Sequence, residues 1–173
     1  MVKAGPVERT GTTRRTGSDK AVLRIFGLVL LGLMLAGDLL AVEVFIPQIS
    51  ARPGEMVQVP VVVDQAEGLA GVKLVLTYEP DVLQFKEAAK GPKAQAMMHI
   101  VNDRKPGHLI LVMAGARGID GKNLVLFHLG FQVQKSMKNG RESTRVQIVE
   151  TQLLSEQLRE IKATVKTGVI RLE

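Results

Sequence analysis

From residue 42 to its end, the chain consists of short runs of valine, isoleucine, leucine and phenylalanine, separated by turn signals rich in glycine and proline. Over residues 72–78 the side chains alternate with a period of two, which is the repeat of a β-strand. Many short strands with frequent turn signals predict an all-β sandwich. Nine strands are predicted, at 44–46, 57–63, 72–78, 98–101, 109–113, 124–133, 145–149, 161–165 and 169–172.

The segments between these strands carry the usual turn residues. Pro60 lacks an N–H group and therefore predicts an edge strand or a bulge. The glycine-rich segment 115–121 predicts a flexible strand connection, and Asn139-Gly140 predicts a tight hairpin turn. Residues 86–97 predict a mobile connection or one short helix. The segment 153–161 is compatible with a two-turn helix or with a hairpin loop, and its strand-like flanks favour the loop.

The N-terminal part of the chain has a different composition. Residues 1–24 are polar and basic and predict disorder, whereas 25–41 form an apolar segment that predicts a helix. Its uninterrupted part, 25–37, would span only about 20 Å as a helix, too short for a hydrocarbon core of about 30 Å. This favours a secretory signal peptide cleaved after Ala41, with an uncleaved membrane anchor over 25–42 as the alternative. Either alternative places 42–173, the predicted sandwich domain, outside the cytoplasm, at the cell surface or in the extracellular space.

Charge and cysteine content exclude several classes of protein. The chain carries a formal net charge of +6, but over residues 42–173 its 17 basic side chains alternate with 14 acidic ones. Nucleic-acid binding requires a concentrated basic stripe, so it is not expected here. The absence of cysteine excludes a disulfide framework, a thiolate metal site and a cysteine nucleophile.

The residues that could carry chemistry do not form a recognisable site. His99, His108 and His128 show no tight metal-binding spacing, so neither a metal nor another cofactor is expected. The acidic residues of the predicted turns are expected to be solvated or to cap backbone N–H groups, and no serine nucleophile motif occurs. We therefore expect no enzymatic activity. The acidic residues in question are Asp64, Glu67, Glu79, Asp81, Asp103 and Asp120.

A carbohydrate-binding module is an alternative that uses the same fold. Flat polysaccharide surfaces are usually bound by a row of exposed aromatic rings. Alternation assigns Tyr78, Phe127 and Phe131 to the core, which leaves only Phe45 and Phe85 beyond residue 41. Too few rings remain for such a platform.

Several motifs of the chain resemble those of a known family. Pro53-Gly54-Glu55 and Val57-x-Val59-Pro60-Val61 are followed by Tyr78-Glu79-Pro80-x-x-Leu83, and later by Pro106-Gly107-x-Leu109 and Leu129-x-Phe131-x-Val133. This succession resembles the cohesin domain and covers about residues 43–172. In the Tyr78 motif we expect an inward tyrosine at the strand end, a proline that stops the ladder, and Leu83 closing the end of the sandwich.

The resemblance implies a nine-stranded antiparallel sandwich of jelly-roll topology without catalytic activity. It also implies a function: binding a dockerin, a calcium-loaded helical partner, at the cell surface or in an extracellular assembly such as one that degrades polysaccharides. The binding face implied is one sheet made of 72–78, 98–101, 109–113 and 124–133. A further alternative is an anchored periplasmic-side subunit of a surface or secretion assembly. The partner-binding residues expected on that face are Lys73, Val75, Thr77, Ile110, Val112, Leu124, Leu126 and His128.

Apolar residues on the second face of two strands support a protein partner. If Leu109 and Leu111 point inward, Ile110 and Val112 point outward; in the opposite phase Met113 joins the exposed set. Exposed aliphatic patches usually mark an interaction site. Alternatively, the C-terminal segment or the 86–97 connection covers them. If the patch is exposed, Leu126→Asp should weaken binding without affecting folding.

Overall fold

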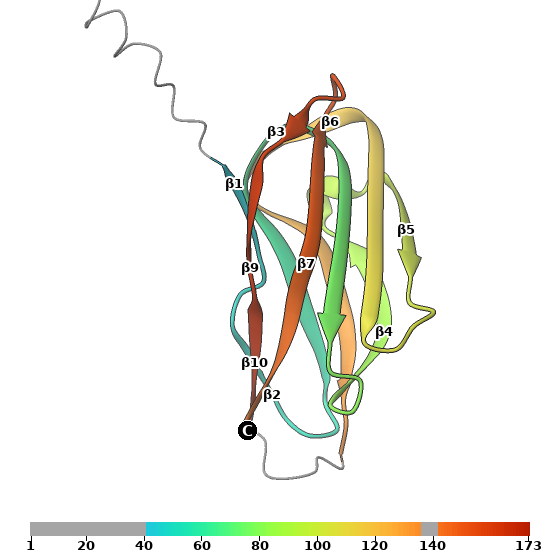
Figure 1. Cartoon of the computed structure of the whole chain (residues 1–173), viewed down its shortest axis with the longest axis vertical. Helices are drawn as coiled ribbons and strands as arrows, with labels where there is room; N and C mark the ends of the chain where they lie inside the picture. Colours follow the sequence, from blue (N-terminus) through green and yellow to red (C-terminus); the bar gives the residue numbers. More distant parts are fainter. Residues whose placement is uncertain (1–40, 136–141) are drawn as a thin grey trace, which may run out of the picture. The chain divides into compact units, whose positions relative to one another are not determined.

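The computed structural model describes residues 41–135 and 142–173, which form ten strands and one 3-10 turn (Figure 1). Every strand belongs to one hydrogen-bonded network, whose longest path runs β2-β10-β7-β3-β1-β9. The elements are β1 (Val42–Phe45), β2 (Ile49–Ala51), β3 (Met56–Tyr78), β4 (Leu83–Lys90), η1 (Pro92–Ala94), β5 (Met98–Asn102), β6 (His108–Val133), β7 (Ser143–Ser155), β8 (Glu160–Ile161), β9 (Ala163–Lys166) and β10 (Gly168–Leu172).

The strands form two layers, and the two long strands β3 and β6 run through both. The front layer contains β5, the first half of β6, the second half of β3, and then β7, β10 and β2. The back layer contains β4, the second half of β6, the first half of β3, and then β1 and β9. Buried apolar side chains from both layers meet in one core, which confirms the all-β sandwich.

The change of layer occurs where the ladder between β3 and β6 is irregular. Register shifts fall between Ala66 and Leu69 and between Leu69 and Gly71, and such shifts let a strand bend into another layer. A Cβ atom at Gly118 would lie 2.3 Å from a backbone carbon of Gly68, so only glycine permits this crossing. The prediction of a flexible connection at 115–121 is therefore wrong, because these residues belong to β6.

The predicted strand count and pairing need correction. The structure has ten strands among its described residues instead of nine: 57–63 and 72–78 are one strand, as are 109–113 and 124–133, while β2 and β4 were not predicted. The sheet is not wholly antiparallel either, since β1 pairs in parallel with β9, and β2 with β10. The C-terminal segment 161–165 divides into β8 and β9.

The structure defines the two connections at 86–97 and 153–161. Residues 83–90 form β4, because the neighbouring half of β6 supplies hydrogen-bond partners from Val133 to Phe127. The mobile or helical connection expected over 86–97 is therefore limited to the turn around η1. The hairpin loop expected within 153–161 is confirmed, since Leu153 pairs with Ile161 and Leu154 with Glu160.

The alternation that assigns Phe127 and Phe131 to the core does not extend over the whole of 124–133, because a bulge interrupts it. Val61 pairs with Phe127 and Val62 with Val125, so Leu126 has no opposite residue on β3. The bulge reverses the phase of the strand: Leu126 and Phe127 are both fully buried, although they are neighbours. Pro60 lies next to this irregularity, as its missing N–H group predicted.

Some expectations fall outside the described residues. The structure does not describe residues 1–40 or 136–141. These include the disorder predicted at 1–24, the signal or anchor helix predicted over 25–41 (except Ala41) and the turn predicted at Asn139-Gly140. Within 41–135 and 142–173, no helix is long and apolar enough to span a membrane.

Candidate functional site

The front layer has one face on the core and one face away from it. On β3, Val72, Leu74 and Leu76 are buried in the core. Lys73, Val75 and Thr77, at the alternate positions, therefore lie on the outer face, as alternation predicted. This outer face is formed by β5, β6, β3 and β7, side by side in that order.

Aliphatic side chains cluster on the part of this face formed by β5 and β6. Ile100 pairs with Val112, Asn102 with Ile110, and Met98 with Ala114. Met98 is 78% exposed and Ile100 69%, while Val112 is 36% exposed and Ile110 is partly buried. We call Met98, Ile100, Ile110 and Val112 the aliphatic patch.

The two most exposed members of the patch were missed by the sequence reasoning. Residues 98–101 were expected on this sheet, but Met98 and Ile100 were not assigned to the binding surface. Met98-His99-Ile100-Val101 does contain the relevant signal, because alternate positions carry apolar side chains. In the structure Val101 packs against the core, which places Met98 and Ile100 on the opposite, outer side.

Polar groups border the aliphatic patch on β3 and β7. Lys73 pairs with Val112 on one side and with Gln152 on the other. Its Nζ atom lies 2.6 Å from Oε1 of Glu150, and both side chains are exposed enough to be solvated. An exposed pair of this kind contributes little to stability. It supplies instead a charged edge beside the apolar surface, as is usual for protein interfaces.

Val75 lies in the middle of the outer face but is only 6% exposed. It sits in register between Ile110 of β6 and Glu150 of β7. Thr77 is partly buried and pairs with His108. The structure thus brings five of the eight expected binding residues onto one face: Lys73, Val75, Thr77, Ile110 and Val112.

The other three expected residues are not on this face. Leu124, Leu126 and His128 lie in the half of β6 that belongs to the back layer, where it pairs with β4 and the first half of β3. Leu124 is 7% exposed and Leu126 fully buried, so the prediction that they form an exposed patch is wrong. The fourth strand of the face is β7 instead, because β6 changes layer before residue 124.

Neither of the segments expected to cover the patch does so. Residues 86–90 belong to β4 in the back layer, and the C-terminal strand β10 pairs with β7 from Gly168↔Val146 to Arg171↔Ser143. Among the described residues, Met98 and Ile100 thus remain exposed.

The aromatic side chains lie elsewhere. Phe127 and Phe131 are fully buried in the core, as alternation predicted, and Tyr78 packs edge-on against Phe131 with 5.1 Å between ring centroids. The Tyr78 motif behaves as expected: β3 ends at Tyr78, and Leu83 is fully buried at that end of the sandwich. None of the outward-facing residues named above on the front layer is aromatic.

The histidines are dispersed over the molecule. His99 lies near Phe127, with 6.3 Å between ring centroids, while His108 and His128 are at separate positions of β6. Over 41–135 and 142–173, no three His, Asp or Glu side chains are grouped closely enough to hold a metal ion.

Comparison with known proteins relates this geometry to a family. The family model of the cohesin domain matches residues 42–172. A search of curated proteins gave no match. Among solved structures, the chain is similar to a non-cellulosomal cohesin from the hyperthermophilic archaeon Archaeoglobus fulgidus, with 20% sequence identity and a TM-score of 0.67 over 77% of this chain and 91% of that chain.

Two further similar structures are complexes. One is the sixth cohesin of scaffoldin B from Acetivibrio cellulolyticus with a mutant Cel5 dockerin, at 20% identity and a TM-score of 0.68 over 77% of this chain and 99% of that chain. The other is the Coh-OlpC–Doc435 complex of Clostridium thermocellum, a type I cohesin–dockerin complex, at 16% identity and a TM-score of 0.68 over 77% and 94% of the two chains. At these identities the structural likeness establishes the fold, and the family-model match over nearly all of the sandwich shows that this chain belongs to the cohesin-domain family.

Proposed function

We propose that the chain is a non-catalytic, exported protein-binding module that binds a dockerin-type, calcium-loaded helical partner through the outer face of β5, β6, β3 and β7. The observation that carries this proposal is the aliphatic patch. Met98 and Ile100 expose most of their side chains next to Val112 on a regular sheet. Exposed apolar groups gathered in this way usually mark an interaction surface.

The family supports a dockerin as the type of partner. Several cohesins that share this fold were solved as complexes with dockerins. The charges beside the patch also suit a protein partner, because the Lys73–Glu150 pair stands next to Val112 on one side. An apolar centre with a polar rim is the usual arrangement of a protein–protein interface.

Export is proposed from the N-terminal sequence. A basic segment followed by a short apolar run and the small residue Ala41 is typical of a secretory signal, and β1 begins at the next residue, Val42. Cleavage would release the module into the extracellular space, while retention of 25–42 would hold it at the cell surface.

Binding can be tested with the full chain immobilised and a panel of purified dockerins applied with calcium or with a chelator. Replacing Ile100 with Asp should remove roughly 2 kcal/mol of the binding free energy that comes from burying its side chain, which corresponds to about a thirtyfold loss of affinity. Because Ile100 is exposed, the variant should unfold at the wild-type temperature.

Val165→Asp is a matched control. Val165 is 45% exposed but lies on β9 in the back layer, so its replacement should leave binding unchanged. Calcium-dependent binding that Ile100→Asp abolishes and Val165→Asp preserves would support the proposal. Binding that both variants retain would place the dockerin on another face, and no binding across the panel would remove the main support for this type of partner.

A further inference from the structure

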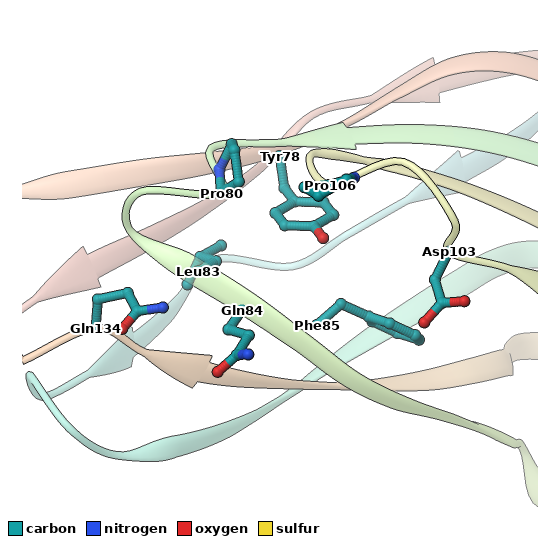
Figure 2. Close-up of a pocket in the computed structure, with 8 residues that line it drawn as sticks. All are labelled: Tyr78, Pro80, Leu83, Gln84, Phe85, Asp103, Pro106 and Gln134. Atoms are coloured by element: carbon teal, nitrogen blue, oxygen red, sulfur yellow. The ribbon is translucent and has the colours of Figure 1, made fainter.

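A cavity of about 320 Å³ lies at the end of the sandwich where β3 turns into β4 (Figure 2). Its residues come from the end of β3, the β3–β4 turn, the start of β4, the β5–β6 turn and the segment that follows β6. Tyr78 and Phe85 supply two aromatic rings, and Pro80 and Pro106 stand beside them. The volume lies at the lower end of the range of small-molecule sites.

Both rings are held in fixed orientations by the core. Tyr78 packs against Phe131 with 5.1 Å between centroids and an interplanar angle of 64°. Phe85 packs against the same ring at 5.7 Å and 68°. Because Phe131 is fully buried, these two edge-to-face contacts fix the rings before any ligand arrives.

Backbone contacts also hold the surrounding turns in place. The N–H group of Tyr78 donates to the carbonyl oxygen of Gly107 at 3.0 Å, which fastens the β5–β6 turn to the end of β3. Gly107 has a φ of +79°, and a Cβ atom there would lie 3.2 Å from Pro80 Cδ. On the other side, the N–H group of Gln134 donates to the carbonyl oxygen of Val82 at 2.8 Å. The cavity is therefore largely preformed.

Polar groups surround the rings. Asp103 contributes a carboxylate, Gln84 and Gln134 contribute amides, and Tyr78 contributes a hydroxyl group. Gln84 accepts a hydrogen bond from Lys86 Nζ at 2.8 Å. The side-chain polar atoms of Asp103, Gln134 and Tyr78 have no hydrogen bond or ion pair with any residue that the structure describes.

We propose that this cavity binds a neutral pyranose unit of a carbohydrate. A pyranose has apolar C–H faces that can pack on fixed aromatic rings and hydroxyl groups around its edge. Those hydroxyls can donate to the carboxylate of Asp103 and both donate to and accept from the amides of Gln84 and Gln134. The rings and rigid prolines thus match the apolar C–H face of the sugar. The mixed hydrogen-bond donors and acceptors match its hydroxyl groups.

Two other ligand classes match the cavity less well. A proline-rich peptide could pack on the rings, but its proline residues have no N–H group to donate to Asp103. A methylated ammonium ion would suit the rings and the carboxylate but offers no acceptor for the amide N–H groups. Each would make fewer hydrogen bonds with the cavity than a sugar does, while the exposed side chains of Asp103 and Gln84 stay hydrated.

This site is distinct from the aliphatic patch, because no residue of the patch lines the cavity. It also differs from the row of exposed rings that a flat polysaccharide surface requires. A cavity of this size would hold one sugar unit, and we expect a dissociation constant on the order of 1 mM.

The test is an NMR titration of the ¹⁵N-labelled full chain with cellotriose, xylotriose, mannotriose and chitotriose, each to about 20 mM, which nearly saturates a millimolar site. We expect at least one saccharide to shift the amide signals of Tyr78, Phe85 and Asp103. Asp103→Asn should weaken that binding about tenfold, because it removes a charged acceptor. Asp81→Asn is the matched control, since Asp81 is exposed near the same end but does not line the cavity.

Saccharide shifts that Asp103→Asn weakens and Asp81→Asn preserves would support the site. No shift with any of the four saccharides, or shifts that Asp103→Asn leaves unchanged, would overturn it. A hexaproline peptide and choline are titrated in parallel, and shifts of these amides with either one but with no saccharide would also overturn it. Ile100→Asp should not affect the saccharide titration, so failure of the dockerin proposal and failure of this one can be distinguished.

Discussion

The bulge at Leu126 leads to a prediction about stability that distinguishes the observed strand from one in which inward and outward side chains alternate without interruption. Strict alternation with Phe127 and Leu129 in the core would put Val125 inside and Leu126 outside. In the structure Leu126 is fully buried, whereas Val125 is partly exposed. The two residues are adjacent and both aliphatic, so each serves as the control for the other.

Leu126→Ala should reduce the free energy of unfolding by about 3 kcal/mol, because it removes buried methyl groups and leaves a cavity. Val125→Ala should reduce it by less than about 1 kcal/mol. A loss of about 3 kcal/mol is a large part of a typical stability of 5–15 kcal/mol, and it should lower Tm by roughly 10 °C. Leu126→Asp should prevent folding, contrary to the expectation from sequence that only binding would suffer.

Urea unfolding followed by far-UV circular dichroism measures these differences, since the chain has no tryptophan and only one tyrosine. The m-value should stay constant, so that a change in the midpoint reports stability alone. A larger loss for Val125→Ala than for Leu126→Ala would refute the bulge and the phase reversal that depends on it.

Three further predictions concern other parts of the chain. Gly118→Ala should reduce the free energy of unfolding by about 2 kcal/mol or more, because its Cβ would lie 2.3 Å from facing backbone. Gly71→Ala should reduce it by less, because its Cβ would meet only a side chain, at 3.1 Å. Equal losses for the two variants in urea unfolding would contradict this reasoning. A double-mutant cycle on Lys73 and Glu150 should give a coupling below about 1 kcal/mol, since both side chains are solvated, and a coupling of several kcal/mol would show a buried pair instead. Mass spectrometry of the protein from the producing cell should find a mature chain cut after Ala41, and an intact N-terminus would indicate an anchor.

The sequence by itself determined the class of fold and many of its local features. Valine-rich runs with period two predicted where most of the strands lie, although not their number or their bounds, and Tyr78-Glu79-Pro80 predicted the end of β3. The loop between β7 and β8 was also predictable, because turn chemistry and strand propensity are properties of a few neighbouring residues. The pattern of the family motifs was local in the same sense, and it identified the family correctly.

The tertiary structure alone decided which strands share a face. The two-residue period of a strand shows which of its side chains lie on the same face. It does not show which strands pair with each other. Residues 109–113 and 124–133 belong to one strand, β6, that crosses from the front layer to the back layer. Leu124, Leu126 and His128 therefore lie in the back layer, and the fourth strand of the front face is β7.

The exposure of the binding surface was decided in the same way. Met98 and Ile100 are exposed because β5 is an edge strand whose outer side no other described segment covers, and Val75, equally apolar, is buried between β6 and β7. Burial depends on neighbours far away in the chain, and bulges shift the phase by a single residue. Neither effect leaves a reliable mark on the local sequence, so only the folded chain could place the aliphatic patch.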